Sequence, residues 1–183
     1  MVEEEASGAM AGATVRRAGP GDAHAIAEVT VTSWQEAYRG ILPDEFLDSL
    51  RVAPREMAWQ EMLGRDARGR TPAWVAEGDG GVGGFVSCGP PRDEDVPLPA
   101  AEVYAIYVQP AAWRRGLGRS LLEAATAHCR AGGTRTLVLW VLEANERARA
   151  FYEAMGWQLD GGHREFELGG ASASEVRYRR AVD

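Results

Sequence analysis

A chain of 183 residues with 45% hydrophobic and 26% charged residues can bury one core, and this balance excludes a disordered or fibrous protein. The net charge of -7 argues against nucleic acid as a partner, because general nucleic-acid binding needs a surplus of positive charge facing the phosphates. The chain lacks an apolar run of about 18 residues and starts with acidic residues where a signal peptide would be basic, so we expect a cytoplasmic protein with no membrane partner.

The beginning of the chain predicts a tail, a strand and a helix. Residues 1–13 are small, acidic and unpatterned and predict a disordered tail, whereas residues 14–183 predict a single domain. Residues 14–18 form the predicted strand. Apolar residues at helical spacing then run to about Tyr38, and Asp22 is in position to cap this helix.

Two more helices are predicted before the pattern changes. Residues 44–50 form the shorter helix and residues 54–65 the longer one. On the longer helix we expect Met57, Met62 and Leu63 to face inward.

The middle of the chain switches to strands. Residues 71–89 predict a hairpin around the sequence DGG, and residues 90–99, with four prolines and four charges, predict a loop. Residues 101–110 and 134–142 are apolar strands joined by a glycine turn and a helix, which predicts a parallel pair. The apolar face of that helix consists of Leu117, Leu121, Leu122, Ala125 and Cys129.

The end of the chain predicts one helix and short strands. Residues 144–157 form the helix, closed by Gly156, and residues 157–182 predict three short strands. Cys88 and Cys129 lie far apart in the sequence and the three histidines are scattered. Neither a disulfide framework nor a metal site is therefore indicated.

The stretch QPAAWRRGLGRSLL, residues 109–122, predicts a phosphate-binding turn at the start of a helix. A helix N-terminus presents unpaired N–H groups and the positive end of the dipole, and glycines at 116 and 118 let an anion approach them. The chain contains no lysine, and leucine stands where a third glycine would fall, so neither a Walker loop nor a dinucleotide fingerprint fits. Positive charge around the glycines comes from Arg114, Arg115 and Arg119.

A second segment with polar side chains follows the second apolar strand. Asn145 and Tyr152 are seven residues apart on the predicted helix, which is two turns, so both side chains emerge on one face. Taken singly, Asn145 also fits a helix cap and Tyr152 a half-buried ring.

These two segments together resemble those of the GNAT superfamily of acetyl-CoA-dependent N-acetyltransferases. EVYAIYVQPAAWRRGLGRSLL resembles the family's pyrophosphate segment, Q/R-x-x-G-x-G/A, and NERARAFYEAMGW resembles its second cofactor segment. Trp113 departs from the pattern because it occupies the Q/R position. The resemblance runs from about Thr14 to the C-terminus, and is most specific between Glu102 and Trp157.

The resemblance implies both the fold and the cofactor. It implies an α/β (α+β) fold: one domain with a mixed, mostly antiparallel sheet of about six or seven strands, splayed between the fourth and fifth strands, and about four flanking helices. Acetyl-CoA would be the cosubstrate, with its pantetheine arm along the fourth strand. The implied cofactor-binding residues are Ile106, Tyr107, Val108, Arg114, Arg115, Gly116, Leu117, Gly118, Arg119 and Asn145.

Acetyl transfer to an amine requires an acid and a base. The resemblance makes Tyr152 the general acid that protonates the departing thiolate. Glu102, at the start of the central strand, is the candidate base, directly or through water. Some relatives instead use a glutamate on the following strand, but that position is Trp140 here. Glu143, Glu36 and solvent are the alternatives.

The acceptor is expected to be a small-molecule amine or an N-terminal amine. Trp34 and Tyr38 lie one helical turn apart and are the predicted substrate-binding residues. His163 and Tyr178 are weaker candidates for the opposite wall. A homodimer is compatible with the resemblance. The alternative function is a non-catalytic acyl-CoA-binding or sensor module.

Overall fold

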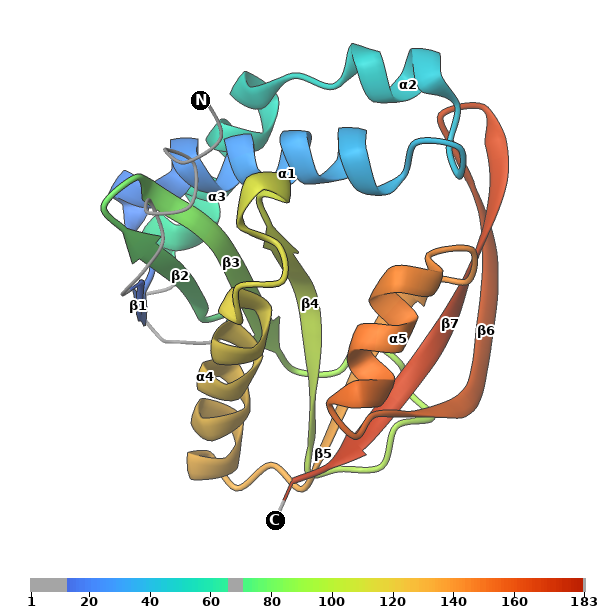
Figure 1. Ribbon diagram of the computed structural model, residues 1–183. Helices are drawn as coiled ribbons and strands as arrows, with labels where there is room; N and C mark the ends of the chain where they lie inside the picture. Colours follow the sequence, from blue (N-terminus) through green and yellow to red (C-terminus); the bar gives the residue numbers. More distant parts are fainter. Residues whose placement is uncertain (1–12, 66–70, 183) are drawn as a thin grey trace.

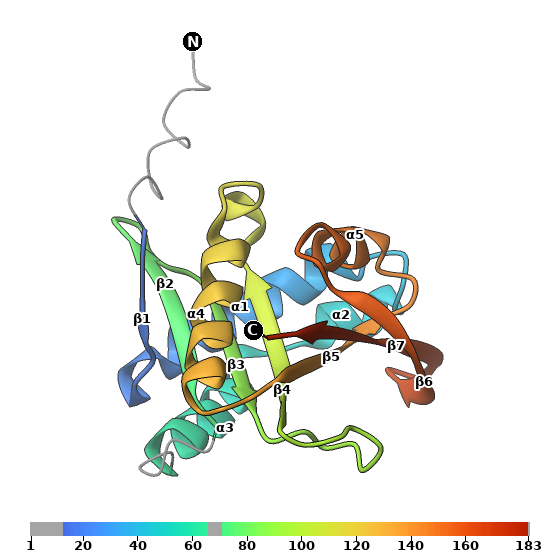
Figure 2. The same cartoon turned by 90° about the horizontal axis from the view of Figure 1, so that it is seen from below.

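The computed structural model describes residues 13–65 and 71–182, and these fold around one sheet (Figure 1). In that part of the chain seven strands follow the order β1-β2-β3-β4-β5-β7-β6. Figure 1 and Figure 2 show α4 and α5 on one face of the sheet and α1 and α3 on the other, while α2 lies beside the tip of the β6–β7 hairpin. None of the helices in these ranges has the length and apolar character that crossing a membrane requires.

Most predicted elements are present within a few residues of their expected bounds. The strands are β1 (Thr14–Arg17), β2 (Ala73–Gly78), β3 (Gly81–Gly89), β4 (Ala100–Val108), β5 (Thr136–Leu142), β6 (Gln158–Leu168) and β7 (Ala171–Ala181). The helices are α1 (Ala23–Ala37), α2 (Asp44–Ser49), α3 (Val52–Arg65), α4 (Leu117–Ala131) and α5 (Glu146–Ala154), with short 3-10 turns η1 (Pro20–Asp22) and η3 (Pro110–Ala112). The predicted tail lies outside the described residues except for Ala13, which packs against the core.

Three local predictions were wrong. Met57 does not face inward but is 64% exposed, because Trp59 and Leu63 form the inner face of α3. Asp22 precedes α1 but does not cap it with its side chain, since its carboxylate accepts hydrogen bonds from Arg16 and from the Gly19 N–H. The C-terminal segment contains two long strands instead of three short ones.

The sheet is antiparallel except at one pair of strands. β4 and β5 are parallel and pair only from Ala100 with Thr136 to Val103 with Leu139. Beyond that point β4 stays paired with β3, while β5 stays paired with β7 as far as Leu142. The two strands therefore diverge, and the predicted splay between the fourth and fifth strands is confirmed.

The predicted apolar face of α4 is also confirmed, because all five of its residues are buried. The helix packs closely on β3 at Gly84. A Cβ atom added there would lie 2.9 Å from the Tyr107 carbonyl oxygen and 3.1 Å from Leu121 Cδ1. The absence of a side chain at Gly84 thus sets the distance between α4 and the sheet.

Replacing Gly84 with alanine is expected to lower the free energy of unfolding by about 1–3 kcal/mol, the usual cost of overpacking a core. Denaturant unfolding measures this change. Gly64 in α3 is the matched control, because no atom lies within 4 Å of a Cβ added there and alanine favours a helix. Equal stability of Gly84→Ala and Gly64→Ala would contradict the close packing.

Candidate active site

In the diverging half of β4, the backbone groups that point toward β5 have no partner on that strand. In an antiparallel ladder the N–H and C=O groups of alternate residues point to the same neighbour. The Gln109 N–H donates to the Gly83 carbonyl on the β3 side at 2.8 Å, so Ile106 and Val108 direct their backbone groups to the open side. The Val108 carbonyl there accepts hydrogen bonds from Ser33 Oγ at 3.0 Å and Trp113 Nε1 at 2.7 Å.

Tyr107 is placed differently from its neighbours Ile106 and Val108. The side chains of Ile106 and Val108 pack against the core under α4 and α5, whereas the Tyr107 ring packs on the opposite face with Phe85. By the same alternation, its backbone groups face β3. Of these three predicted cofactor-binding residues, only Ile106 and Val108 therefore line the opening with their backbone.

The predicted glycine turn lies at the start of α4 and has an unusual backbone. Gly116 has a φ of 84°, and Arg114 has a φ of 61°, which is rare for a residue with a side chain. The first bond of the helix runs from the Ser120 N–H to the Gly116 carbonyl at 3.0 Å. The N–H groups of Leu117, Gly118 and Arg119 precede that bond and are available to an anion.

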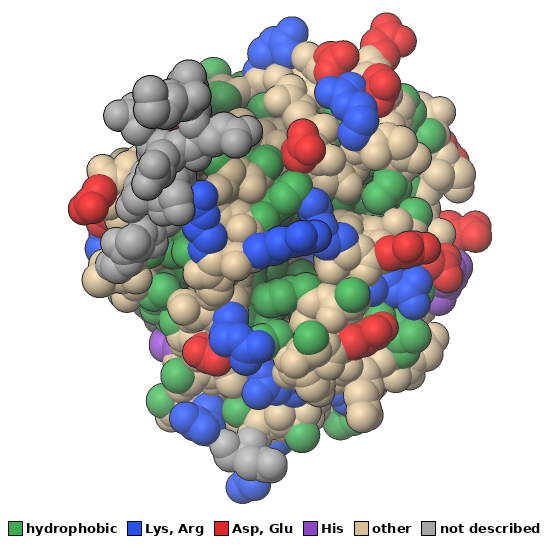
Figure 3. Space-filling model, in the orientation of Figure 1, with side chains coloured by type: hydrophobic (Ala, Val, Ile, Leu, Met, Phe, Trp, Pro, Cys, Tyr) green, Lys and Arg blue, Asp and Glu red, His purple; other side chains and the backbone are tan. Residues whose placement is uncertain are grey.

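The surface between α4 and α5 is hollowed and carries positive charge. Figure 3 shows hydrophobic side chains on its floor and arginine side chains over and beside it. Arg114, Arg115 and Arg119 are all exposed near the turn. Gly118 on α4 faces α5, because a Cβ added there would be 3.4 Å from the Phe151 ring.

Trp113 and Arg147 connect the two sides of the opening. The Arg147 guanidinium, from the first turn of α5, lies 3.5 Å from the centroid of the Trp113 ring, which precedes α4. The pKa of Arg147 is lowered overall, mainly by burial. The charge of Arg114 also lowers it, whereas Glu36 acts in the opposite direction. Sequence reasoning missed Arg147 although it stands two residues after Asn145. The available signal was a cation in the first turn of the helix that Asn145 begins.

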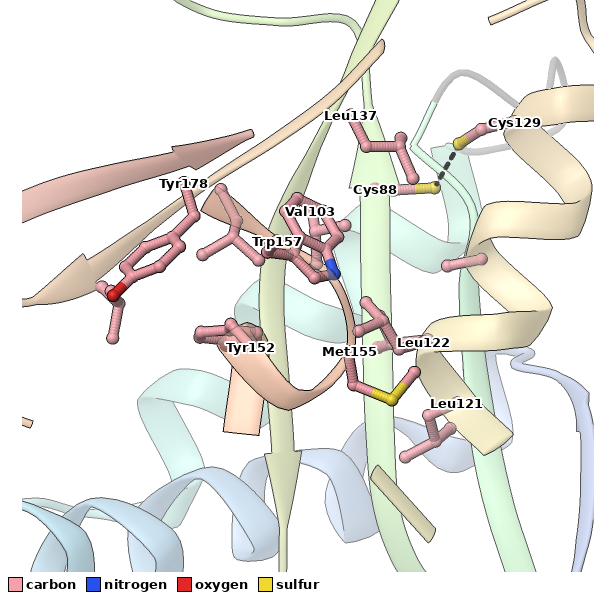
Figure 4. Packing of buried hydrophobic residues seen from close by; sticks show 14 of the residues in the cluster. Cys88, Val103, Leu121, Leu122, Cys129, Leu137, Tyr152, Met155, Trp157 and Tyr178 are labelled. Carbon is pink, nitrogen blue, oxygen red and sulfur yellow. Dashed lines mark hydrogen bonds between the residues drawn. The ribbon is translucent and has the colours of Figure 1, made fainter. Parts of the chain in front are cut away.

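Tyr152 projects from α5 into an aromatic environment. Its ring lies 6.2 Å from the Trp157 ring and 6.1 Å from the Tyr178 ring (Figure 4). Burial raises the pKa of Tyr152 well above the usual value, and the nearby Tyr107 phenol raises it further. The phenol therefore stays protonated at neutral pH. Among the described residues its hydroxyl has no hydrogen-bond partner.

Asn145 caps α5. Its Oδ1 accepts a hydrogen bond from the Ala148 N–H at 3.1 Å, and the residue is buried. The simpler of the two sequence interpretations is thus present in the structure. The cap fixes the first turn of α5, and with it the position of Arg147.

Glu102 is buried and already paired. It lies on the section of β4 that is paired on both sides, with Gly89 and Val138, and its exposed fraction is 0%. Its carboxylate accepts hydrogen bonds from the Arg92 backbone N–H at 2.9 Å and from Arg92 Nε at 3.0 Å. The same ion pair raises the pKa of Arg92, whose side chain is half exposed.

The two predicted acceptor residues lie together with a third aromatic residue. Trp34 and Tyr38 have ring centroids 5.2 Å apart, and the hydroxyls of Tyr38 and Tyr107 are 3.5 Å apart. Burial raises the pKa of Tyr38, and Tyr107 and Tyr152 raise it further. The tyrosine that follows α1, one from β4 and one from α5 are thus close enough to shift one another's pKa.

Trp34 has a structural role as well, because its ring packs against the core cluster between α1, α2 and the β6–β7 hairpin. Its Nε1 atom is buried, and no described residue accepts a hydrogen bond from it.

The two weaker wall candidates do not meet the acceptor residues. Tyr178 is fully buried in the core, where its hydroxyl donates to Glu153 at 2.6 Å and accepts from Arg149 Nε at 3.2 Å. His163 is exposed, and its Nε2 lies 3.7 Å from Glu143. Tyr178 is therefore a structural residue.

The fold defines the class of protein first. The structure matches the PaiA N-acetyltransferase of Thermoplasma acidophilum, solved with coenzyme A, with a TM-score of 0.75 over 92% of this chain and 98% of that one, at 19% identity. It matches YncA of Salmonella typhimurium, solved with acetyl-CoA, with a TM-score of 0.70 over 93% and 94%, at 24% identity. At these identities the shared property is the N-acetyltransferase fold.

The sequence then identifies the family. Residues 29–157 match the model of the acetyltransferase (GNAT) family. The uncharacterised N-acetyltransferase YuaI of Bacillus subtilis is 34% identical over 164 residues, which are 89% of this chain and 90% of YuaI. The chain therefore belongs to the GNAT family and is an acetyltransferase, with acetyl-CoA as its acetyl donor.

Proposed function

We propose that the protein transfers the acetyl group of acetyl-CoA directly to a primary amine of a small molecule or of a peptide N-terminus. The observation that carries this proposal is the open end of the β4–β5 pair, with the anion-accepting turn on one side and Tyr152 on the other. Family membership supports acetyl transfer. The absence of a lysine in the turn fits a pyrophosphate that is held and not cleaved.

The chain offers donors for each part of the cosubstrate. The N–H groups at the start of α4 would receive the pyrophosphate, and Arg147 would contribute charge from the facing helix. The free backbone groups of Ile106 and the Val108 N–H would hydrogen-bond the pantetheine amides. Asn145 acts here by capping α5, so we assign it a positioning role.

Two groups of the chain would handle the charge that develops during transfer. A backbone N–H on the open side of β4 would stabilise negative charge on the thioester oxygen, which needs only fixed geometry. Tyr152 would donate its proton to the leaving sulfur. Its raised pKa keeps that proton in place until a thiolate forms beside it.

We assign the base to water. An alkylammonium with a pKa of about 10 must lose a proton before it attacks the thioester. Both oxygens of Glu102 already accept hydrogen bonds from Arg92, and the carboxylate has no exposed surface. Glu102 would reach an amine only if Arg92 moved away, so its ion pair is better suited to fixing β4 below the opening.

Replacing Glu102 with glutamine is expected to lower kcat by less than about tenfold, whereas loss of a general base costs about 100- to 10,000-fold. Steady-state rates at saturating acetyl-CoA and amine measure the difference. Thermal unfolding of the same variant serves as the control, because the ion pair contributes to stability. A loss of kcat above about 100-fold without unfolding would make Glu102 the base.

The aromatic residues beside the opening form the proposed acceptor site. Trp34, Tyr38 and Tyr107 present rings and hydroxyls to the end of β4 from the face opposite α4 and α5. Aromatic faces attract ammonium groups, and hydroxyl oxygens accept their hydrogen bonds. This arrangement supports an amine acceptor, so the experiment compares different amines as acceptors.

The proposed function is tested with a panel of small amines and of short peptides with free N-termini. Acetylated product is detected by mass, because the chain's own thiols would interfere with a thiol reagent. Thermal unfolding with and without coenzyme A is measured in parallel. Stabilisation by coenzyme A without product from any amine would favour a non-catalytic sensor. No stabilisation and no product would overturn the proposal.

Gly116→Val is expected to raise the KM for acetyl-CoA about tenfold, which corresponds to about 1.4 kcal/mol of binding energy. The reason is backbone strain, because Gly116 has a φ of 84° although nothing lies within 4 Å of an added Cβ. Gly133, beyond the other end of α4, has a φ of 85° and an equally open surrounding.

Gly133→Val is therefore the matched control: it should lose similar stability and keep its KM. A larger KM change in Gly133→Val than in Gly116→Val would count against the proposed phosphate turn.

A further inference from the structure

The two cysteines of the chain meet in the folded protein. Cys88 lies near the end of β3 and Cys129 in the last turn of α4, and their Sγ atoms are 3.5 Å apart (Figure 4). They are the only cysteines in the sequence. Their separation in sequence had indicated no disulfide framework, but the packing of α4 on β3 brings them into contact.

The pair is enclosed by the main core cluster, which includes Leu137 and Val103. Cys88 is 0% exposed and Cys129 is 6% exposed, so of the two residues only Cys129 keeps any contact with solvent. Neither thiol belongs to the proposed acetyl-transfer site. The reaction assigned to that site therefore gives no account of this pair.

The backbone near both cysteines can yield enough for a covalent bond. A disulfide needs the sulfurs about 2.05 Å apart, so the two atoms must approach by about 1.5 Å. Gly132 and Gly133 stand three and four residues after Cys129, where α4 ends. The register of β3 against β4 shifts between Ser87 and Cys88, so the ladder is already irregular beside the second cysteine.

We propose that Cys88 and Cys129 are an oxidative modification site, at which a hydroperoxide converts the two thiols into a reversible intramolecular disulfide. The Cys129 thiolate attacks the peroxide, which cleaves the O–O bond, forms a sulfenic acid and releases water or an alcohol. The Cys88 thiol then attacks that sulfur and releases a second water. Two thiols are oxidised and one peroxide is reduced.

The order of attack follows from exposure and hydrogen bonding. Cys129 has the exposed edge, and donation from the Cys88 thiol lowers the pKa of Cys129. Cys88 is fully buried and stands next to the sulfur it must attack. The product would tie β3 to α4, the helix that begins at the proposed phosphate turn.

The experiment counts free thiols by mass in the full-length protein. Reduced protein is treated with hydrogen peroxide, cleared of oxidant, denatured and alkylated. The expected result is loss of both alkylation sites, a monomer on a non-reducing gel, a peptide pair linking Cys88 and Cys129, and recovery of two sites after dithiothreitol. Two remaining alkylation sites, a sulfinic acid at Cys129 or a disulfide between chains would each overturn the proposal.

Thermal unfolding gives a second readout of the crosslink. The oxidised protein should melt several degrees above the reduced protein, because the crosslink restricts the unfolded chain. In Cys88→Ala and Cys129→Ala the treatment should give no such rise. The thiol count on the wild-type chain decides the question even if either variant fails to fold.

Discussion

Tyr152→Phe is expected to lower kcat by about 100- to 10,000-fold, the usual contribution of a general acid. The KM for acetyl-CoA should change little, because the ring remains and the proposed phosphate contacts come from α4. Because burial raises the pKa of Tyr152, the phenol stays protonated through neutral pH. The pH profile of the wild type should therefore show no loss of activity from Tyr152 below a pH of about 10.

Tyr178→Phe is the matched control for Tyr152→Phe. The Tyr178 ring lies 6.1 Å from the Tyr152 ring, and its hydroxyl is bonded to Glu153 and Arg149 away from the proposed chemistry. We expect this control to lose stability and to keep kcat. If the two variants lost kcat equally, the effect of Tyr152→Phe would come from packing and the role of general acid would be wrong.

Local patterns in the sequence predicted the frame of the site. The apolar spacing on α4 gave its buried face, because a helix on a sheet buries one stripe of side chains. Two continuous apolar strands around that helix indicated the parallel pair, and the open end of the pair follows from the family resemblance. The frame was predictable because each signal lies within one element or its immediate neighbour.

Contacts between distant segments were not predictable in this way. Glu102 was considered as a base because of its place on the strand, but its partner Arg92 comes from the proline-rich loop and leaves no periodic signal. The contact between Cys88 and Cys129 was not predicted for the same reason, because the two residues lie far apart in the sequence. On α3 the spacing allowed more than one inner face, and packing of Trp59 on Phe85 selected the one that excludes Met57.

Arg177→Leu is expected to lower the free energy of unfolding by about 3 kcal/mol, because it removes the main partner of the buried Asp160 carboxylate and leaves that charge only Arg179 Nε, 3.3 Å away. Arg177 is 4% exposed and its Nε donates to Asp160 at 2.9 Å. Its Nη atoms donate to Asp93 at 3.0 Å and to Asp95 at 2.6 Å. One side chain on β7 thus holds both the edge strand β6 and the loop after β3. Denaturant unfolding measures the loss of stability.

Two variants separate burial from charge in this prediction. Arg164→Leu removes a half-exposed partner of Glu175 and should cost about 1 kcal/mol or less, as exposed pairs do. Asp160→Asn added to Arg177→Leu should recover part of the loss, since it removes a buried carboxylate that would keep only Arg179 as its partner. Equal costs for Arg177→Leu and Arg164→Leu would contradict the argument.

Arg177→Leu also tests the assignment of water as the base. Arg177 holds Asp93, and the neighbouring Arg92 holds Glu102. Loosening the loop should free Glu102 from its partner without altering the carboxylate itself. If water is the base, kcat of Arg177→Leu should stay near the wild-type value below its unfolding temperature. A marked rise in kcat would show that Arg92 restrains a basic Glu102.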